Sequence, residues 1–238
     1  MLALFDVLGF ESRLNRMGLD DLSRAYDTLI EVVDSMDGGL VFGPAPSGGG
    51  KFHPRFAYIT TEQAYFSDTI LLWAPFEPFL LRAFCEMCCA LICKSIQIGL
   101  PVRGALSVGR AIMDRSKGAF LGAPLVEAAR MEALQRWLGM SFCHSFSQEP
   151  FNRSFDARVV MLYSKHLKDE QARATPHLVL DWPRHWRQEG LGDLTAAVQA
   201  LDTEPAFHEY YSNTLAFVSH SEEQHDWFNH HQQTPANG

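Results

Sequence analysis

The pattern of hydrophobic and polar positions along the chain predicts alternating strands and amphipathic helices. Residues 2–8 (LALFDVL) are apolar with a single acid, Asp6, and predict a buried strand. From Leu19 to Met36 the apolar positions follow helical spacing, which predicts an amphipathic helix of about five turns. The Gly- and Pro-rich stretch 43–54 that follows indicates a loop.

The next segment is expected to form a hairpin followed by a buried helix. Residues 55–74 are rich in β-branched and aromatic residues, and Ser67 with Asp68 in their middle predicts the tight turn of the hairpin. Residues 78–98 are strongly apolar and predict a buried helix that Gly99 ends.

The second half of the chain continues this alternation. Residues 102–112 predict a strand and residues 123–138 predict a helix. The order strand, helix, hairpin, helix, strand, helix, strand predicts an α+β fold: a ferredoxin-like or palm-type sandwich, one mainly antiparallel sheet with helices packed on one of its faces. Further strands are expected at 140–145, 157–163 and 176–182, and further helices at 191–202 and 205–225.

Composition and charge narrow the classes of function. The 238 residues include 20 Lys and Arg against 28 Asp and Glu, a net charge of −8, which argues against nonspecific binding to nucleic acid or to an anionic membrane. No stretch reaches the roughly 18 uninterrupted apolar residues of a membrane span. Five cysteines, an odd number, do not indicate a disulfide framework. We therefore expect a cytoplasmic protein with reduced thiols and a small-molecule or protein partner.

Two acids are candidates for a functional role because of their positions in the predicted strands and turns. Asp6 lies within an apolar strand, and Asp68 lies at a hairpin turn. A buried carboxylate is costly unless it is paired or metal-bound. Taken singly, each acid is explained as a turn-capping or hydrogen-bonded Asp. Because the predicted fold places the first strand beside the hairpin, the two together can hold two divalent cations.

Four segments resemble, in the same order, the motifs of class III nucleotidyl cyclases. They are FDVLGF (5–10), FSDTILL (66–72), VRGALSVG (102–109) and GAPLVEAARME (122–132). The chain is most similar to the divergent prokaryotic branch, the pyrimidine cyclases of the Pycsar antiphage systems. Because the resemblance covers residues 1–165, we expect a catalytic domain there, a C-terminal extension packed on it at 166–225, and a flexible tail at 226–238.

The resemblance implies a two-metal site. The first-strand acid and the hairpin acid, here Asp6 and Asp68, each contact both metal ions, and the main-chain carbonyl of Val7 contacts one of them. The cofactor implied is Mn²⁺ or Mg²⁺, two ions in each active site, which agrees with the preference of these ions for oxygen ligands and phosphates. The family arginine that stabilises charge on the transferring phosphoryl group corresponds to Arg130; a solvated helix arginine paired with Glu127 or Glu132 is the alternative.

Nucleotide contacts are expected close to the first strand. The main-chain amides around Leu8, Gly9 and Phe10, at the start of the following segment, are placed to bind phosphate. Arg103 is a candidate base or phosphate contact, and a structural ion pair explains it equally well. The expected nucleotide-binding set consists of Phe5, Leu8, Gly9, Phe10 and Arg103.

The chain differs from the purine cyclases at positions that select the nucleotide base. Where those enzymes read adenine or guanine, this chain has Ala64 and Ala119, and neither can bind a purine edge by hydrogen bond. Val126 replaces an Asn that positions the ribose in many purine cyclases. These substitutions favour a pyrimidine triphosphate and do not separate UTP from CTP. The resemblance implies UTP before CTP, because uridylate cyclases are the commoner members of the family. The aromatic residues available to narrow the base pocket are Tyr58, Tyr65 and Phe66.

The leading hypothesis is therefore a homodimeric cyclase that makes a 3′,5′-cyclic pyrimidine monophosphate. The resemblance implies composite sites, with the metal acids from one subunit and the arginine from the other, and a role in antiphage defence in which the product acts on a separate effector protein. No nucleic-acid or membrane partner is expected. The alternatives are an adenylate or guanylate cyclase, a degenerate homologue that binds nucleotide without turnover, and dinucleotide cyclisation, against which FSDT stands in place of a GGDEF-type turn.

Overall fold

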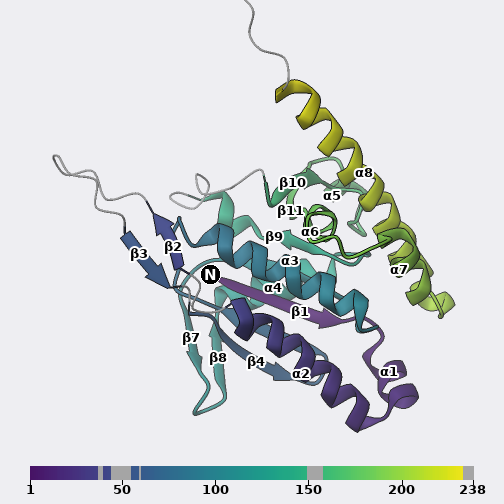
Figure 1. Ribbon diagram of the computed structural model, residues 1–238. Helices are drawn as coiled ribbons and strands as arrows, with labels where there is room; N and C mark the ends of the chain where they lie inside the picture. The colour runs from purple at the N-terminus through teal and green to yellow at the C-terminus, as the bar shows by residue number, and fades with distance from the viewer. Residues whose placement is uncertain (37–39, 44–54, 59, 149–157, 233–238) are drawn as a thin grey trace, which may run out of the picture.

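The computed structural model describes residues 1–36, 40–43, 55–58, 60–148 and 158–232 of the chain. Its centre is a seven-stranded sheet with the strand order β10-β11-β9-β6-β1-β5-β4 (Figure 1). Every neighbouring pair is antiparallel except β6 with β9, which confirms the expected mainly antiparallel sheet. The strands are β1 (Leu2–Val7), β4 (Glu62–Phe66), β5 (Thr69–Trp73), β6 (Val102–Ser107), β9 (Met140–Phe142), β10 (Val160–Tyr163) and β11 (His177–Leu180).

Helices cover both faces of this sheet. The amphipathic helix α2 (Leu19–Met36) and the apolar helix α3 (Leu81–Gln97) lie along one face (Figure 1). They bury the large hydrophobic core, to which β1 contributes Phe5. The helix α4 (Ala123–Ala133) packs on the other face, against a smaller core that includes Leu4. The expectation of helices on one face only is therefore wrong, because the alternating side chains of β1 are buried on both sides.

The larger core is rich in aromatic and sulfur-containing side chains. The buried ring of Phe146 lies between Phe76 and Phe142, with its centroid 6.5 Å and 5.1 Å from theirs. All five cysteines are free and buried, in agreement with the expected reduced core thiols. Burial raises the pKa of the Cys88 and Cys89 thiols well above their ordinary value, so these groups stay protonated and act as packing groups.

Two short ribbons depart from the sequence prediction. Residues 55–58 were expected in the hairpin, but β3 (Arg55–Tyr58) pairs with β2 (Leu40–Gly43) outside the main sheet. Residues 102–112 were expected as one strand, but β6 ends at Ser107. The chain then turns at Gly109 into a ribbon of β7 (Ala111–Asp114) and β8 (Ala119–Gly122). Of the expected loop 43–54, Gly43 is the last residue of β2 and residues 44–54 lie outside the described residues.

Helices account for most of the remaining differences. The expected helix 123–138 ends five residues early, at Ala133, because the chain turns there to bury Trp137 and Leu138. The last helix continues to Gln232, into the segment that was expected to be a flexible tail. The sequence pattern did not predict α1 (Phe10–Met17) or α6 (Trp182–Gln188). The other helices are α5 (Glu170–Arg173), α7 (Leu194–Leu201) and α8 (His208–Gln232), with short 3₁₀ turns at His144–Ser147 and Pro205–Phe207.

The C-terminal residues form part of the same sheet. β10 precedes residue 165 and β11 follows it, and these two strands pair over four residues. Helix α6 contacts α3, and α8 contacts α6 and α7. Through these contacts the segment after residue 165 packs on the rest of the fold and reaches the end of β1, where the candidate site lies.

Among the helices in the described part of the chain, none has the length and apolar character needed to cross a bilayer.

Candidate active site

Asp6 and Asp68 line one open cleft of about 790 Å³ at the carboxyl end of β1. Asp6 is the penultimate residue of β1, and Asp68 lies in the two-residue turn that joins β4 to β5. The Val7 amide donates a hydrogen bond of 2.9 Å to the main-chain oxygen of Asp68, which ties the turn to the end of the strand. The structure thus brings together the two acids that the sequence singled out, with Val7 between them in the cleft wall.

A hydrogen bond from helix α2 holds the hairpin turn in place. Ser67 has a φ of 57°, a left-handed conformation that is rare for a residue with a side chain. Its carbonyl accepts a hydrogen bond of 3.0 Å from the Tyr26 hydroxyl of α2. Burial and then the charges of Asp68 and Asp6 raise the pKa of Tyr26, so this phenol remains a neutral donor. The contact fixes the position of the turn and, with it, the backbone of Asp68.

Arg103 of β6 lies directly opposite Asp6 in the strand register. Its Nε is 3.2 Å from Oδ2 of Asp6, and its Nη2 is 2.5 Å from Oε1 of Glu132 on α4. Nη1 donates to the main-chain oxygen of Gln135 at 3.0 Å and to the Tyr210 hydroxyl at 3.2 Å. The structural ion pair that the sequence left open is therefore present, and it joins both carboxylates to one guanidinium.

The electrostatics of this cluster are those of partly buried acids. Burial raises the pKa of Asp6, Arg103 opposes that rise, and the nearby charge of Asp68 adds to it. Burial also raises the pKa of Glu132 to about 6, again against the effect of Arg103. Each shift reflects the cost of a carboxylate that has lost water, which the nearby charges of Arg103 and Lys168 offset only in part. A divalent cation in the cleft would relieve this cost.

The segment after β1 has the geometry of a helix start. Gly9 has a φ of 69° and precedes α1, and both Gly9 and Phe10 line the cleft. The amide of Leu8 is already used, because it donates to the main-chain oxygen of Pro101 at 2.9 Å. The side chain of Phe5 is fully buried in the core and does not line the cleft. Of the expected phosphate-binding amides, those that remain for a ligand are at Gly9 and Phe10.

Arg130 does not line the cleft of its own chain. It is exposed on α4 and has no hydrogen bond or ion pair within the described ranges of the chain. Neither expected partner contacts it: Glu127 accepts from the Ser145 amide at 2.9 Å, and Glu132 binds Arg103. A role for Arg130 in this site needs a second subunit.

Residues far along the sequence complete the cleft wall. The Ser12 hydroxyl donates to Glu204 at 2.8 Å, and the ring of Phe207 lies so close to Gly9 that a Cβ there would be 2.8 Å from it. Tyr210 contacts Arg103. Only the packing of the C-terminal segment brings these residues to the site, so no local motif could have identified them.

The donor set fits a metal ion that arrives with a phosphate ligand. Two carboxylates and the Val7 backbone meet at the cleft, and over the residues that the structure describes no group of three or more His, Cys, Asp or Glu side chains is arranged to hold a metal by itself. Mg²⁺ is commonly bound through one or two carboxylates together with substrate phosphates and water. The site therefore suits an ion that the two carboxylates hold and whose remaining ligands are water or substrate phosphates.

Of the aromatic residues expected around a base, the two in β4 lie on opposite faces of the sheet. Phe66 is 48% exposed and stacks on Phe120 of β8 with the ring centroids 6.1 Å apart. Tyr65 is its neighbour in β4 and points to the opposite face of the sheet. Tyr58 belongs to the separate ribbon β2–β3. Phe66 shares its face with Ala64, so it is the aromatic residue that stands beside the expected base-reading position.

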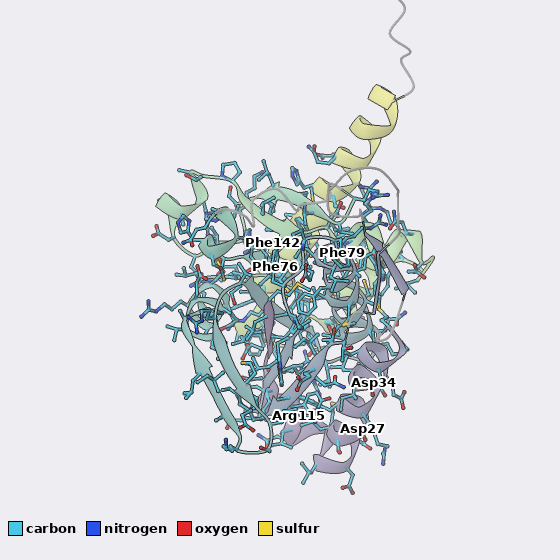
Figure 2. All side chains as sticks on the ribbon, turned by 90° about the vertical axis from the view of Figure 1, so that its left-hand side faces the viewer. Asp27, Asp34, Phe76, Phe79, Arg115 and Phe142 are labelled. Carbon is cyan, nitrogen blue, oxygen red and sulfur yellow. The ribbon has the colours of Figure 1, made fainter. Side chains whose placement is uncertain are left out.

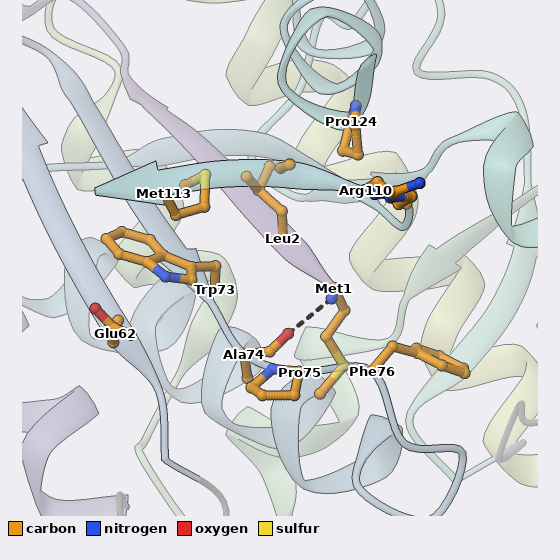
Figure 3. Close-up of a pocket in the computed structure, with 12 residues that line it drawn as sticks. Met1, Leu2, Glu62, Trp73, Ala74, Pro75, Phe76, Arg110, Met113 and Pro124 are labelled. Carbon is orange, nitrogen blue, oxygen red and sulfur yellow. Dashed lines mark hydrogen bonds between the residues drawn. The ribbon is translucent and has the colours of Figure 1, made fainter. Parts of the chain in front are cut away.

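A second cavity, of about 460 Å³, lies at the other end of β1 (Figure 3). Trp73, Arg110 and Pro124 line it, and the Met1 amine donates to the Ala74 carbonyl at 2.8 Å in its floor. None of the site residues expected from the sequence borders this cavity. The candidate chemistry is therefore confined to the Asp6 end of the strand.

Comparison with known proteins adds a distant likeness. No family model matches the chain, and no curated protein does. Among solved structures, a bacterial light-regulated adenylyl cyclase is similar at 11% sequence identity, with a TM-score of 0.42, over 84% of this chain and 96% of that one. Any functional assignment must therefore come from the cleft residues themselves.

Proposed function

We propose that this chain is a nucleotidyl cyclase that converts a pyrimidine nucleoside triphosphate, UTP before CTP, to the 3′,5′-cyclic monophosphate and diphosphate. The observation that carries the proposal is the meeting of Asp6 and Asp68 at one cleft, on the strand and the turn where the cyclase motifs contain them. Two carboxylates beside a helix start suit a metal–triphosphate complex.

The chain's own residues would divide the work as follows. Asp6, Asp68 and the Val7 carbonyl would hold Mn²⁺ or Mg²⁺, which when bound lowers the pKa of the ribose 3′-hydroxyl and neutralises the triphosphate. The amides of Gly9 and Phe10 would bind phosphate oxygens at the positive end of α1. The 3′-oxygen forms a bond to the α-phosphorus as the bond to the bridging oxygen breaks. Diphosphate leaves and the hydroxyl proton passes to water in the open cleft.

The direct test is product identification. The purified chain, incubated with each of the four ribonucleoside triphosphates and Mn²⁺, should yield cyclic UMP and an equal amount of diphosphate by mass spectrometry. The double variant Asp6→Asn with Asp68→Asn is the control and should yield neither. Binding without product would favour the degenerate homologue that Val126 suggests, and a dinucleotide product would favour the third alternative.

A homodimer belongs to the same proposal. Arg130 is exposed on α4, away from the cleft of its own chain. Nearby, Ile112 and Leu121 of the β7–β8 ribbon are each 61% exposed, and Val126 of α4 is 52% exposed. A two-fold contact on this apolar face would cover these residues and allow Arg130 of the partner subunit to reach the triphosphate.

Complementation between subunits tests the composite site. We expect Asp68→Ala and Arg130→Ala to be inactive separately and to regain about a quarter of wild-type activity when mixed, because half of randomly paired dimers are mixed and each has one intact site. The measurement is turnover after subunit exchange, verified by native mass spectrometry of differently tagged chains. Exchange without recovered activity would show that each site is built from one chain.

The biological role in this proposal rests on the resemblance alone. A cyclic pyrimidine nucleotide would act on a separate effector protein that the cyclase reaches through its product and not by contact. Phage infection would be the trigger. In this proposal the activating signal would come from another component.

A further inference from the structure

The first turn of α8 contacts the arginine that holds Asp6. Tyr210 lies 107 residues from Arg103 in the sequence, yet its hydroxyl is 3.2 Å from Nη1 of Arg103. The guanidinium carbon lies 5.3 Å from the centroid of the Tyr210 ring, which adds a cation–π contact to the hydrogen bond. Through Tyr210, the C-terminal segment thus contacts the arginine that lies beside the expected metal site.

The contacts of Arg103 determine which carboxylate oxygen of Asp6 stays available to a metal ion. All three guanidinium nitrogens have partners, and Nε alone contacts Asp6, at Oδ2. The other carboxylate oxygen, Oδ1, accepts from no donor in the described segments. A guanidinium free to turn would contact both oxygens in the bidentate manner that arginine prefers, and it would then compete with a metal ion. Glu132 and Tyr210 hold it away from that position.

We propose that Tyr210 is a positioning residue for the metal-binding carboxylate. It fixes Arg103 so that Arg103 orients Asp6 through one oxygen and leaves the other for the metal ion. The proposal rests on the proposed function, because it requires a metal ion at Asp6.

The anchoring of α8 separates this role from simple packing. The helix is held independently of Tyr210, since Asn213 donates to the Arg136 carbonyl at 2.8 Å and the Leu138 amide donates to the Thr214 hydroxyl at 2.8 Å. Loss of one hydroxyl group at Tyr210 should therefore leave α8 in place. A change in metal binding would then report on the arginine and not on the docking of the helix.

The test measures Mn²⁺ binding to the full chain by electron paramagnetic resonance, without nucleotide and without turnover. Tyr210→Phe should bind Mn²⁺ about fivefold more weakly at an unchanged thermal midpoint, because only part of the effect of one lost hydrogen bond to a charged group reaches Asp6 through Arg103. Tyr211→Phe is the matched control, since its hydroxyl accepts from Arg13 at 3.2 Å outside the cleft lining. In turnover, Tyr210→Phe should raise the KM for Mn²⁺ and leave kcat at saturating Mn²⁺ nearly unchanged.

Two further comparisons separate the ways in which the idea could fail. Arg103→Lys keeps the positive charge but loses the planar guanidinium with its several donors. In that background Tyr210→Phe should have no additional effect on Mn²⁺ binding. Asp6→Asn should abolish that binding. If Asp6→Asn binds as the wild type does, the metal site fails and the positioning role fails with it. If Asp6→Asn loses binding while Tyr210→Phe binds as tightly as the wild type, only the positioning role is overturned.

Discussion

Replacing either Asp6 or Asp68 with alanine is expected to reduce turnover by about two to four orders of magnitude, which corresponds to about 3–5 kcal/mol of transition-state stabilisation. In the proposed site each carboxylate contacts both metal ions, so the loss of one affects both ions. Neither change should disturb the fold. Arg103 keeps Glu132 when Asp6 is lost, and the hydrogen bond from the Val7 amide to residue 68 uses a main-chain oxygen that alanine retains.

The measurement is kcat with saturating UTP and Mn²⁺, alongside circular dichroism and the thermal midpoint of each variant. Asp27→Ala is a matched control, because Asp27 is an exposed carboxylate on α2 and lies outside the cleft (Figure 2). It should retain wild-type turnover. A folded Asp6→Ala or Asp68→Ala variant that keeps substantial activity would refute the two-metal assignment.

Where the fold could be predicted, the signal was local. The Ser67-Asp68 turn and the strands on either side of it follow from residues that are neighbours in the sequence. The pairing of β2 with β3 joins residues on either side of the Gly- and Pro-rich stretch, and local patterning does not report on such contacts. The early end of α4 has a similar cause, because burial of Trp137 in the tertiary core outweighs the helical periodicity.

The residues of the site likewise fall into two groups: those that a local sequence signal predicts and those that only tertiary packing brings to the site. Asp6 could be found because an acid in an apolar strand is unusual by local rules. Asp68 is an ordinary turn residue taken singly, and it became a candidate because the predicted fold places its hairpin beside the strand of Asp6. Phe5 could have been placed in the core by the two-residue period of β1, since its position alternates with that of Asp6. Tyr210 gave no such signal. A tyrosine near the start of a helix is ordinary until the packing of that helix brings it to Arg103.

The proposed preference for a pyrimidine base depends on the side chains beside Ala64. With Ala64 and Ala119 in place of purine-reading residues, these positions give no hydrogen bond to adenine or guanine. An unfilled pocket would accept either ring, so selectivity for a pyrimidine also needs a steric element. Phe66 is the candidate for that element, because it is exposed beside Ala64 and its stack on Phe120 restricts its movement.

We therefore expect kcat/KM for UTP, and less so for CTP, to exceed the values for ATP and GTP at least tenfold, since a clash of about 2–3 kcal/mol already gives about a hundredfold preference. Phe66→Ala should raise purine turnover before it lowers pyrimidine turnover. Tyr65→Leu, on the opposite face of β4, is the control and should leave the ratio unchanged because it does not reach the same side of the sheet. If ATP were the best substrate of the unaltered chain, the pyrimidine assignment would be wrong, while the site formed by Asp6 and Asp68 would stand as that of an adenylate cyclase.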